Sequence, residues 1–416
     1  MVQSILNVER VDFFNLLVVK SSNFILVATI FFIVRQHLDS SLFIEFGFYW
    51  GTGLLVGALL FGGFGSTLVR FVSLYGGIGA IGGDRTISKL LTAVLVFIAA
   101  SLYIVGKGLD NKIISLLMVV SLGMVIQLHL VIMSLFRAVR ATRELLFGGA
   151  LMAVVIPSIF IYLTNSIDTI ETIFRNLTIS YLISLIILMA LLAYIARHDE
   201  KDRSENIFQS KGFKEGYLSF TMVTVFSNLI ILVDFYFLRE MLSSEDLAKA
   251  GVAKIYFDRF VLPLLSVMTG AISLNILRSK TESIARNAGF TTNFGLDRKR
   301  VLAVIPVLLF IFIGYYVFIF VGPSNAVSLS YLQASCVILG YVVYSFNSIF
   351  LDILVIKFAS STLFLILSSY LIVSSLVYYF AISTFSLKGW VSALIILNLS
   401  ASYFFFKVTS SVRLIK

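Results

Sequence analysis

The chain has 416 residues, of which 59% are hydrophobic and only 13% are charged, and its formal net charge is +10. Soluble globular domains contain roughly 45–50% apolar residues, so this composition excludes a water-soluble fold. The single cysteine, Cys336, excludes an intrachain disulfide.

About 12 apolar stretches follow one another along the chain, each near the ~20 residues of helix that cross a bilayer core roughly 30 Å thick. Inside hydrocarbon, every backbone N–H and C=O must be satisfied within the segment, so such stretches are helical. We therefore predict an all-α polytopic membrane protein. The predicted spans are residues 13–34, 43–68, 90–106, 113–136, 145–164, 177–196, 216–237, 250–274, 301–321, 329–355, 359–380 and 389–407.

Lysines and arginines concentrate in alternate connections between these spans. If the N-terminus is cytoplasmic, 22 of the 32 basic residues fall in inside segments and six in outside segments. Basic loops stay in the cytoplasm during insertion, so both termini are predicted to be cytoplasmic. The net charge of +10 then reflects contact with anionic lipid headgroups rather than with nucleic acid.

A hydrophilic segment, residues 197–214, divides the chain near its middle and has half of the predicted spans on either side. Several transporter classes are built as two related halves around a central site. We therefore predict an N-terminal six-helix bundle over residues 1–200 and a C-terminal six-helix bundle over residues 201–416, around a central cavity.

Small residues and prolines indicate how individual spans are built. The pairs Gly47/Gly51 and Gly53/Gly57 have the Gly-x-x-x-Gly spacing that lets helices approach closely, and packing within the bundle is the preferred interpretation over dimerisation. Prolines inside spans either kink the helix or are tolerated without functional movement. Such prolines are Pro157, Pro263 and Pro306.

Two patterns in the sequence resemble cofactor or metal sites, but neither has the structural context that such a site requires. Residues 77–82 match the dinucleotide pattern Gly-x-Gly-x-x-Gly, but they lie between two membrane spans and not in a βαβ unit. The histidines His37, His129 and His198 are scattered and lack metal-ligand spacing. No cofactor, no metal and no catalytic residue is expected.

Polar side chains recur inside four of the spans. Such residues are costly in hydrocarbon and usually face a bundle interior or a water-filled cavity, so we predict that these spans line one central aqueous cavity. The residues are Asp12, Asn15, Lys20 and Asn23 in the first span; Thr221, Thr224, Ser227, Asn228 and Asp234 in the seventh; Lys254, Asp258 and Arg259 in the eighth; and Tyr341, Ser345, Ser348 and Asp352 in the tenth.

Structural explanations of the same charges stay open at this point. Lys254 and Asp258 are four residues apart and could simply neutralise each other as an i,i+4 pair. Arg259 could snorkel or pair with a neighbouring helix. Asp234 could be an ordinary interfacial residue near the outer face.

Three segments resemble the polysaccharide-transporter (O-antigen flippase) family of the multidrug/oligosaccharidyl-lipid/polysaccharide (MOP) exporter superfamily. They are residues 62–75, GGFGSTLVRFVSLY; residues 234–260, DFYFLREMLSSEDLAKAGVAKIYFDRF; and residues 135–144, LFRAVRATRE. With the length and the 6+6 topology, the resemblance covers essentially the whole chain. One departure is Lys254-Ile255-Tyr256, where a smaller and less charged stretch is expected.

The resemblance implies a flippase in the cytoplasmic (inner) membrane of a bacterium. It would move an undecaprenyl-pyrophosphate-linked oligosaccharide from the inner to the outer leaflet by alternating access, for O-antigen, capsule or exopolysaccharide assembly. Candidate substrate-binding residues are Lys20, Asn23, Arg70, Thr224, Asn228, Lys254, Arg259, Tyr341 and Ser345. Candidate sites of coupling to H⁺ or Na⁺ are Asp234, Asp258 and Asp352.

Expected partners are the lipid-linked oligosaccharide, membrane lipids and the polysaccharide polymerase machinery. Three other functions stay open. A drug or cation antiporter of the same superfamily would favour an acidic, aromatic cavity. A membrane glycan polymerase or ligase, which would be an enzyme, would need a large outer loop for its catalytic groups. A scaffold protein would tolerate neutralisation of Lys20, Lys254 and Arg259.

Overall fold

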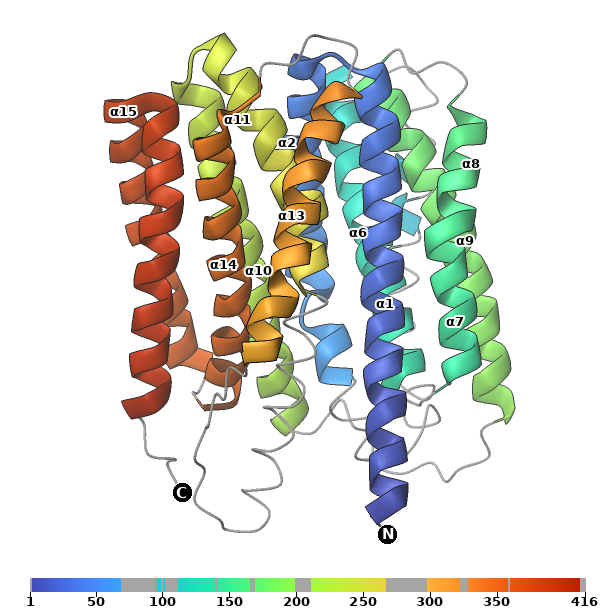
Figure 1. Ribbon diagram of the computed structural model, residues 1–416. Coiled ribbons are helices and arrows are strands. Elements are labelled where there is room, and N and C mark those ends of the chain that lie inside the picture. Colours follow the sequence, from blue (N-terminus) through green and yellow to red (C-terminus); the bar gives the residue numbers. More distant parts are fainter. Residues whose placement is uncertain are drawn as a thin grey trace. The chain divides into compact units, whose positions relative to one another are not determined.

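The computed structural model describes residues 2–68, 94, 96–98, 100–101, 111–138, 141–164, 169–198, 211–266, 298–321, 328–357 and 360–411 (Figure 1). All regular structure in these ranges is helical. The helices are α1 (Val2–His37), α2 (Ser40–Phe61), α6 (Asn111–Ala138), α7 (Thr142–Ala150), η1 (Leu151–Val155), α8 (Ile156–Leu163), α9 (Ile170–His198), α10 (Lys211–Met241), α11 (Ser244–Tyr256), η3 (Phe257–Val261), α13 (Arg298–Phe320), α14 (Tyr331–Lys357) and α15 (Ser360–Ser411).

The prediction of an all-α polytopic membrane protein is confirmed. Within the described ranges, 7 helical stretches are long and apolar enough to cross a membrane. Helical residues are also found in every one of the predicted spans. The last of these stretches, Ser360–Val408, covers the two spans predicted at 359–380 and 389–407. Its helix bends at Ser386, where the backbone leaves helical geometry at φ 50° and ψ −129°.

The chain forms two compact units whose boundaries run through helices rather than between them. The first unit comprises Met1–Ile30, Glu45–Leu232 and Phe358–Leu371, and the second comprises Phe31–Ile44, Val233–Lys357 and Ile372–Lys416. The division into bundles over residues 1–200 and 201–416 stays a prediction, as do the cytoplasmic positions of both termini.

In the first unit, α2 and α6 approach closely through glycines. A Cβ atom on Gly53 would lie 2.6 Å from the carbonyl oxygen of Val119, and one on Gly57 would collide with the backbone of Gly123. The pair Gly53/Gly57 therefore packs within the protein, as its spacing indicates.

Two π-helical turns, η1 and η3, each end two residues before a proline. Pro157 and Pro263 lack the N–H that would donate to the carbonyls of Ala153 and Arg259 in an α-helix. The widened turn accommodates this missing bond, and π-turns of this kind frequently occur at functional sites. Helix α13 runs through Pro306 without such a turn.

Candidate functional site

Three charged side chains meet in the interior of the second unit. They are Asp234 near the end of α10, Lys254 in α11 and Asp258 in the π-turn η3, and they are 3%, 1% and 5% exposed. Lys254 Nζ lies 2.9 Å from Asp234 Oδ1 and 2.8 Å from Asp258 Oδ2. A charge in such surroundings is stable only when it is paired and hydrogen-bonded.

A tyrosine from α14 completes this group. Tyr341 donates its hydroxyl proton to Asp258 Oδ1 at 2.5 Å, and Lys254 Nζ donates to the same hydroxyl at 3.3 Å. The ring of Phe257 stacks on Tyr341 with the ring centroids 5.3 Å apart, which fixes the hydroxyl in place. We call Asp234, Lys254, Asp258 and Tyr341 the buried charge cluster.

The buried charge cluster has more acid than base. The ammonium of Lys254 has three N–H donors, and its three partners are Asp234, Asp258 and the hydroxyl of Tyr341. Two carboxylates share one ammonium, so these four residues carry one net negative charge, and the neighbouring guanidinium of Arg259 interacts electrostatically with Asp258. Trp390, which is fully buried in α15, lies close enough to Asp234 to influence its carboxylate.

The structure therefore decides two of the structural explanations that the sequence left open. Lys254 and Asp258 do form an i,i+4 pair, but Asp234 from another helix shares the ammonium, so the pair is part of a larger network. Asp234 is buried and is not an interfacial residue. The role of Lys254 as a phosphate contact stays a prediction, and its donors are occupied in this conformation.

Two arginines of the second unit lie against phenylalanine rings. The guanidinium carbon of Arg259 is 5.9 Å from the ring centroid of Phe31, and that of Arg35 is 5.4 Å from the centroid of Phe43. The rings of Phe31 and Phe43 meet edge to face at 6.2 Å. Among the described residues, Arg259 makes no salt bridge within 4.0 Å. Such cation–π contacts stabilise a charge without neutralising it.

Arg35 is a residue that the sequence analysis missed, because it was counted in an outside connection. The helix α1 continues beyond residue 34 to His37, and Arg35 is 0% exposed. Its Nη1 donates to the carbonyl of Leu38 at 3.5 Å, whereas Nε and Nη2 have no hydrogen-bond partner in the described part of the chain. The signal that could have found it is an arginine only one residue beyond a long apolar run.

Predicted sugar-binding groups of α10 lie in the first unit and take part in helix packing. Thr224 Oγ1 donates to the carbonyls of Phe220 at 2.9 Å and of Gly62 at 3.3 Å. Asn228 Nδ2 donates to the carbonyl of Thr224 at 2.9 Å. Their side chains are partly exposed, so a role in binding stays a prediction.

The other candidates are placed as follows. Lys20 and Asn23 lie on α1 in the first unit and are partly buried. Ser345 is buried in α14 and donates to the carbonyl of Val342 at 2.7 Å. Arg70 and the side chain of Asp352 lie outside the described residues.

Solved structures with the same fold are membrane transporters. A multidrug resistance MATE family transporter of the MOP superfamily, in an outward-facing conformation, is similar over 96% of this chain and 95% of that chain, with a TM-score of 0.58 and 13% identity. The chain shares the fold of this MOP superfamily transporter, which we call the MOP fold. A MOP superfamily transporter from Pyrococcus furiosus is similar over 97% of this chain and 94% of that chain, with a TM-score of 0.55 and 14% identity.

A MATE transporter in a bent conformation is similar to this MOP-fold chain over 95% of its length and 92% of that chain, with a TM-score of 0.57 and 14% identity. No protein-family model and no curated protein matches the sequence. Among the described residues of this MOP-fold chain, no three His, Cys, Asp or Glu side chains are grouped so that they could hold a metal ion. In the buried charge cluster, the ammonium of Lys254 lies between the carboxylates of Asp234 and Asp258.

Proposed function

We propose that this MOP-fold chain is a flippase of the bacterial cytoplasmic membrane, without enzymatic activity. It moves a lipid-linked oligosaccharide, of the undecaprenyl-pyrophosphate type, to the outer leaflet for surface polysaccharide assembly. The observation that carries the proposal is the cationic character of Arg259. Both carboxylate oxygens of Asp258, its neighbour in η3, already have partners, one being Lys254 and the other Tyr341. Asp258 therefore forms no salt bridge with Arg259 within 4.0 Å.

A pyrophosphate group is charged, so it must be paired with a cation when it moves from water into the interior of the membrane protein. Arginine guanidinium groups bind phosphate oxygens through paired, charge-assisted hydrogen bonds. Arg259 is held over the ring of Phe31 with its charge retained, so it can attract the pyrophosphate. Lys20 is a second candidate for this attraction, and hydroxyl and amide groups such as Thr224 and Asn228 bind sugar hydroxyls.

The buried charge cluster serves as the coupling site in this proposal. Intramembrane carboxylates commonly form ion pathways in transporters. The place between Asp234 and Asp258 is occupied by the ammonium of Lys254, which excludes a sodium ion from the same position. A proton, by contrast, can add to a carboxylate oxygen and neutralise the excess negative charge. Proton coupling is therefore favoured over sodium coupling.

Export of drugs or organic cations is the second candidate function, and the fold itself favours it. One similar solved structure is a multidrug resistance transporter of the MOP superfamily. Another MOP superfamily transporter has a binding pocket whose reversed polarity suggests a different function for that protein. The charge of the cargo separates the two functions, because an organic cation would be repelled by Arg259.

Complementation tests the proposal. The chain is expressed in a bacterium whose own polysaccharide flippase is deleted and whose glycan pathway supplies the native oligosaccharide. Wild type should restore surface polysaccharide, Arg259→Gln should not, and Lys214→Gln, a change of an exposed lysine in α10, should restore it fully. Membrane expression of each variant is measured by immunoblot. Failure of the wild-type chain, together with resistance to cationic drugs, would favour the antiporter.

A further inference from the structure

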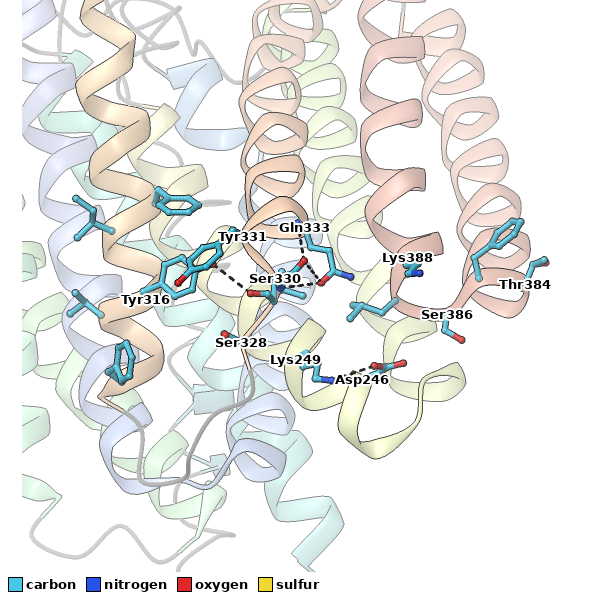
Figure 2. A pocket seen from close by; sticks show the side chains of 17 residues that line it. Asp246, Lys249, Tyr316, Ser328, Ser330, Tyr331, Gln333, Thr384, Ser386 and Lys388 are labelled. Carbon is cyan, nitrogen blue, oxygen red and sulfur yellow. Dashed lines mark hydrogen bonds and ion pairs between the residues drawn. The ribbon is translucent and has the colours of Figure 1, made fainter.

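A groove of about 1220 Å³ lies within the second unit, apart from the buried charge cluster (Figure 2). Its walls come from the start of α11, the final turns of α13, residues 328–330 with the start of α14, and the bend of α15. Small-molecule sites commonly have volumes of roughly 300–1,000 Å³. The groove therefore suits an extended ligand rather than a single small molecule.

An aromatic platform forms one wall of the groove. The ring of Tyr331 packs on Tyr316 with the centroids 5.4 Å apart and on Phe312 at 6.3 Å, while Tyr331 itself is 73% exposed. Tyr316 donates its hydroxyl proton to the carbonyl of Leu329 at 3.5 Å, which ties the platform to the segment before α14. Tyrosine offers a rigid, amphipathic contact surface at low entropic cost.

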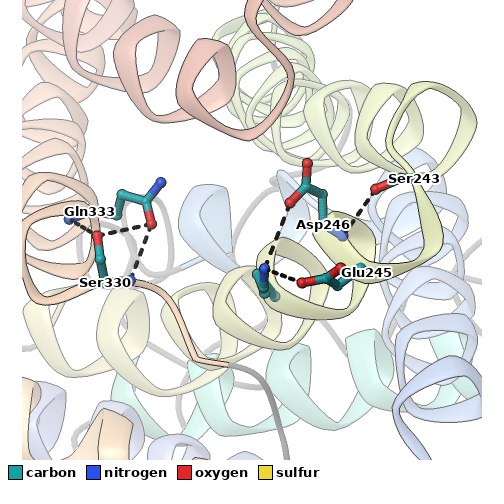
Figure 3. Close-up of polar contacts among 6 residues, drawn as sticks. Ser243, Glu245, Asp246, Ser330 and Gln333 are labelled. Carbon is teal, nitrogen blue, oxygen red and sulfur yellow. Dashed lines mark hydrogen bonds and ion pairs between the residues drawn. The ribbon is translucent and has the colours of Figure 1, made fainter.

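Next to this platform, a capping box at the start of α14 fixes an amide donor. The backbone N–H and the hydroxyl of Ser330 both donate to Oε1 of Gln333, at 3.1 Å and 3.0 Å (Figure 3). Because Oε1 is held in this way, the amide nitrogen of Gln333 points away from Ser330 into the groove (Figure 2). That nitrogen carries two N–H donors.

The positive charge of the groove comes from Lys388, because Lys249 is balanced by the neighbouring acids Glu245 and Asp246. Lys249, Lys388 and Asp246 line it. Lys249 Nζ lies 2.7 Å from Glu245 and 4.0 Å from Asp246, both of which are labelled in Figure 3. Lys388 is exposed and forms no salt bridge with any described residue (Figure 2). The contact with Glu245 raises the pKa of Lys249, so this side chain keeps its charge.

The bend of α15 adds a strained polar residue. Ser386 lines the groove and has φ 50°, a left-handed value that favours glycine. A non-glycine residue held there costs free energy, and such strain concentrates at binding and catalytic sites. The hydroxyl of Ser386 is therefore a candidate ligand contact.

We propose that this groove binds an acidic saccharide, that is, a glycan segment carrying carboxylate groups. The aromatic platform supports the apolar face of a sugar ring, the amide of Gln333 donates to hydroxyl or carboxylate oxygens, and Lys388 pairs with the carboxylate. The inference rests on the proposed function, because the bound saccharide would be part of the exported glycan, and it names the chemical class of that glycan.

Binding of soluble sugars tests the groove without requiring transport. The full chain is placed in nanodiscs of phosphatidylcholine, and the probes are tetragalacturonic acid and the neutral maltotetraose, titrated calorimetrically. Tetragalacturonic acid should bind at least about tenfold more tightly than maltotetraose, a difference in affinity that one good charge-assisted contact supplies. Lys388→Gln should remove about this factor, Tyr331→Ala should weaken both probes, and the control Lys214→Gln should change neither.

Several outcomes would overturn the inference. They are equal affinity for the two probes, no binding of either, or an unchanged affinity for tetragalacturonic acid in Lys388→Gln. If tetragalacturonic acid binds in phosphatidylcholine nanodiscs but not in nanodiscs that also contain phosphatidylglycerol, the groove would instead be assigned to anionic lipid headgroups. Thermal unfolding of each variant checks that it is folded. A chain that binds tetragalacturonic acid but fails complementation would overturn the flippase function and leave the groove intact.

Discussion

Lys254 Nζ and Asp234 Oδ1, which come from two different helices, lie 2.9 Å apart in a site almost closed to water. Asp258 shares the same ammonium at 2.8 Å. Removing one of the two acids balances the charges, whereas removing the lysine leaves both acids without their ammonium partner. The two kinds of substitution should therefore change the stability of the protein by different amounts.

Asp234→Asn and Lys254→Met should therefore have different effects on unfolding. Lys254→Met should lower the free energy of unfolding by about 3–5 kcal/mol, the usual cost of breaking a buried ion pair. Asp234→Asn should leave it nearly unchanged, because Lys254 and Asp258 still form a balanced pair. Thermal unfolding of the detergent-purified variants measures both. An equal loss in the two variants would contradict the assignment of excess negative charge to the cluster.

Transport should depend on protons and not on sodium. In proteoliposomes loaded with a fluorescent lipid-linked oligosaccharide, an imposed pH gradient should accelerate flipping, and replacing sodium by N-methylglucamine should have no effect. The reason is that the ammonium of Lys254 already occupies the space between the carboxylates of Asp234 and Asp258. Asp234→Asn should remove the response to the pH gradient. Acceleration by a sodium gradient alone would refute this prediction.

Arg35→Met should stabilise the protein. The guanidinium is fully buried, and two of its nitrogens have no hydrogen-bond partner in the described part of the chain. Leaving buried donors unsatisfied costs about 1–3 kcal/mol, and methionine fills a similar volume without this cost. A rise in melting temperature is expected, with Lys214→Gln as a neutral control. If the variant melts at a lower temperature, the contacts of the guanidinium with the ring of Phe43 and the carbonyl of Leu38 outweigh this cost.

Pro263→Ala should impair transport while the protein remains folded. An alanine at this position supplies the N–H for the carbonyl of Arg259 and allows η3 to become α-helical. The side chains of Asp258 and Arg259 would then point in different directions, and complementation should fail. Pro306→Ala in α13, where no π-turn precedes the proline, is the matched control and should complement normally. Equal behaviour of the two variants would show that the π-turn has no role in transport.

Ser386→Gly should raise the free energy of unfolding by about 1 kcal/mol. A left-handed serine costs about 1–3 kcal/mol, and glycine removes this cost but adds roughly 0.5–1 kcal/mol of backbone entropy. Denaturant-dependent unfolding measures the difference. Ser383→Gly, a change within regular helix in the same arm of α15, should be destabilising by comparison.

The sequence was sufficient to predict the membrane class and, within the described residues, the segments that form apolar helices, because hydrophobic length alone determines which segments can cross a bilayer. It also drew attention to Asp234, Lys254, Asp258 and Tyr341, since each is polar within an apolar run. It did not predict that these four residues meet. Only the pair Lys254 and Asp258 has a spacing that implies contact, whereas the other contacts depend on how separate helices pack.

Two further differences between the sequence-based prediction and the structure have clear physical causes. Arg35 was assigned to a connection because the apolar run ends at residue 34, but an arginine at a helix end can be buried as well as exposed to water. The polar stripe of α10 was interpreted as cavity lining. Thr221 Oγ1 accepts from the backbone N–H of Gly63 at 3.1 Å, and Thr224 Oγ1 donates to the carbonyl of Gly62. Both glycines directly follow α2, so part of this stripe is a packing contact. Periodicity alone does not distinguish these cases.

The bend at Ser386 has a consequence for how the protein is made. Helical structure continues on both sides of this residue, so the two arms of α15 are joined without a hydrophilic loop (Figure 1). We therefore expect the two arms to enter the bilayer together, as one hairpin, during synthesis. An epitope tag, a protease site or a glycosylation sequence inserted at this position would therefore disrupt biogenesis, unlike insertions at flexible loop tips, which are usually tolerated.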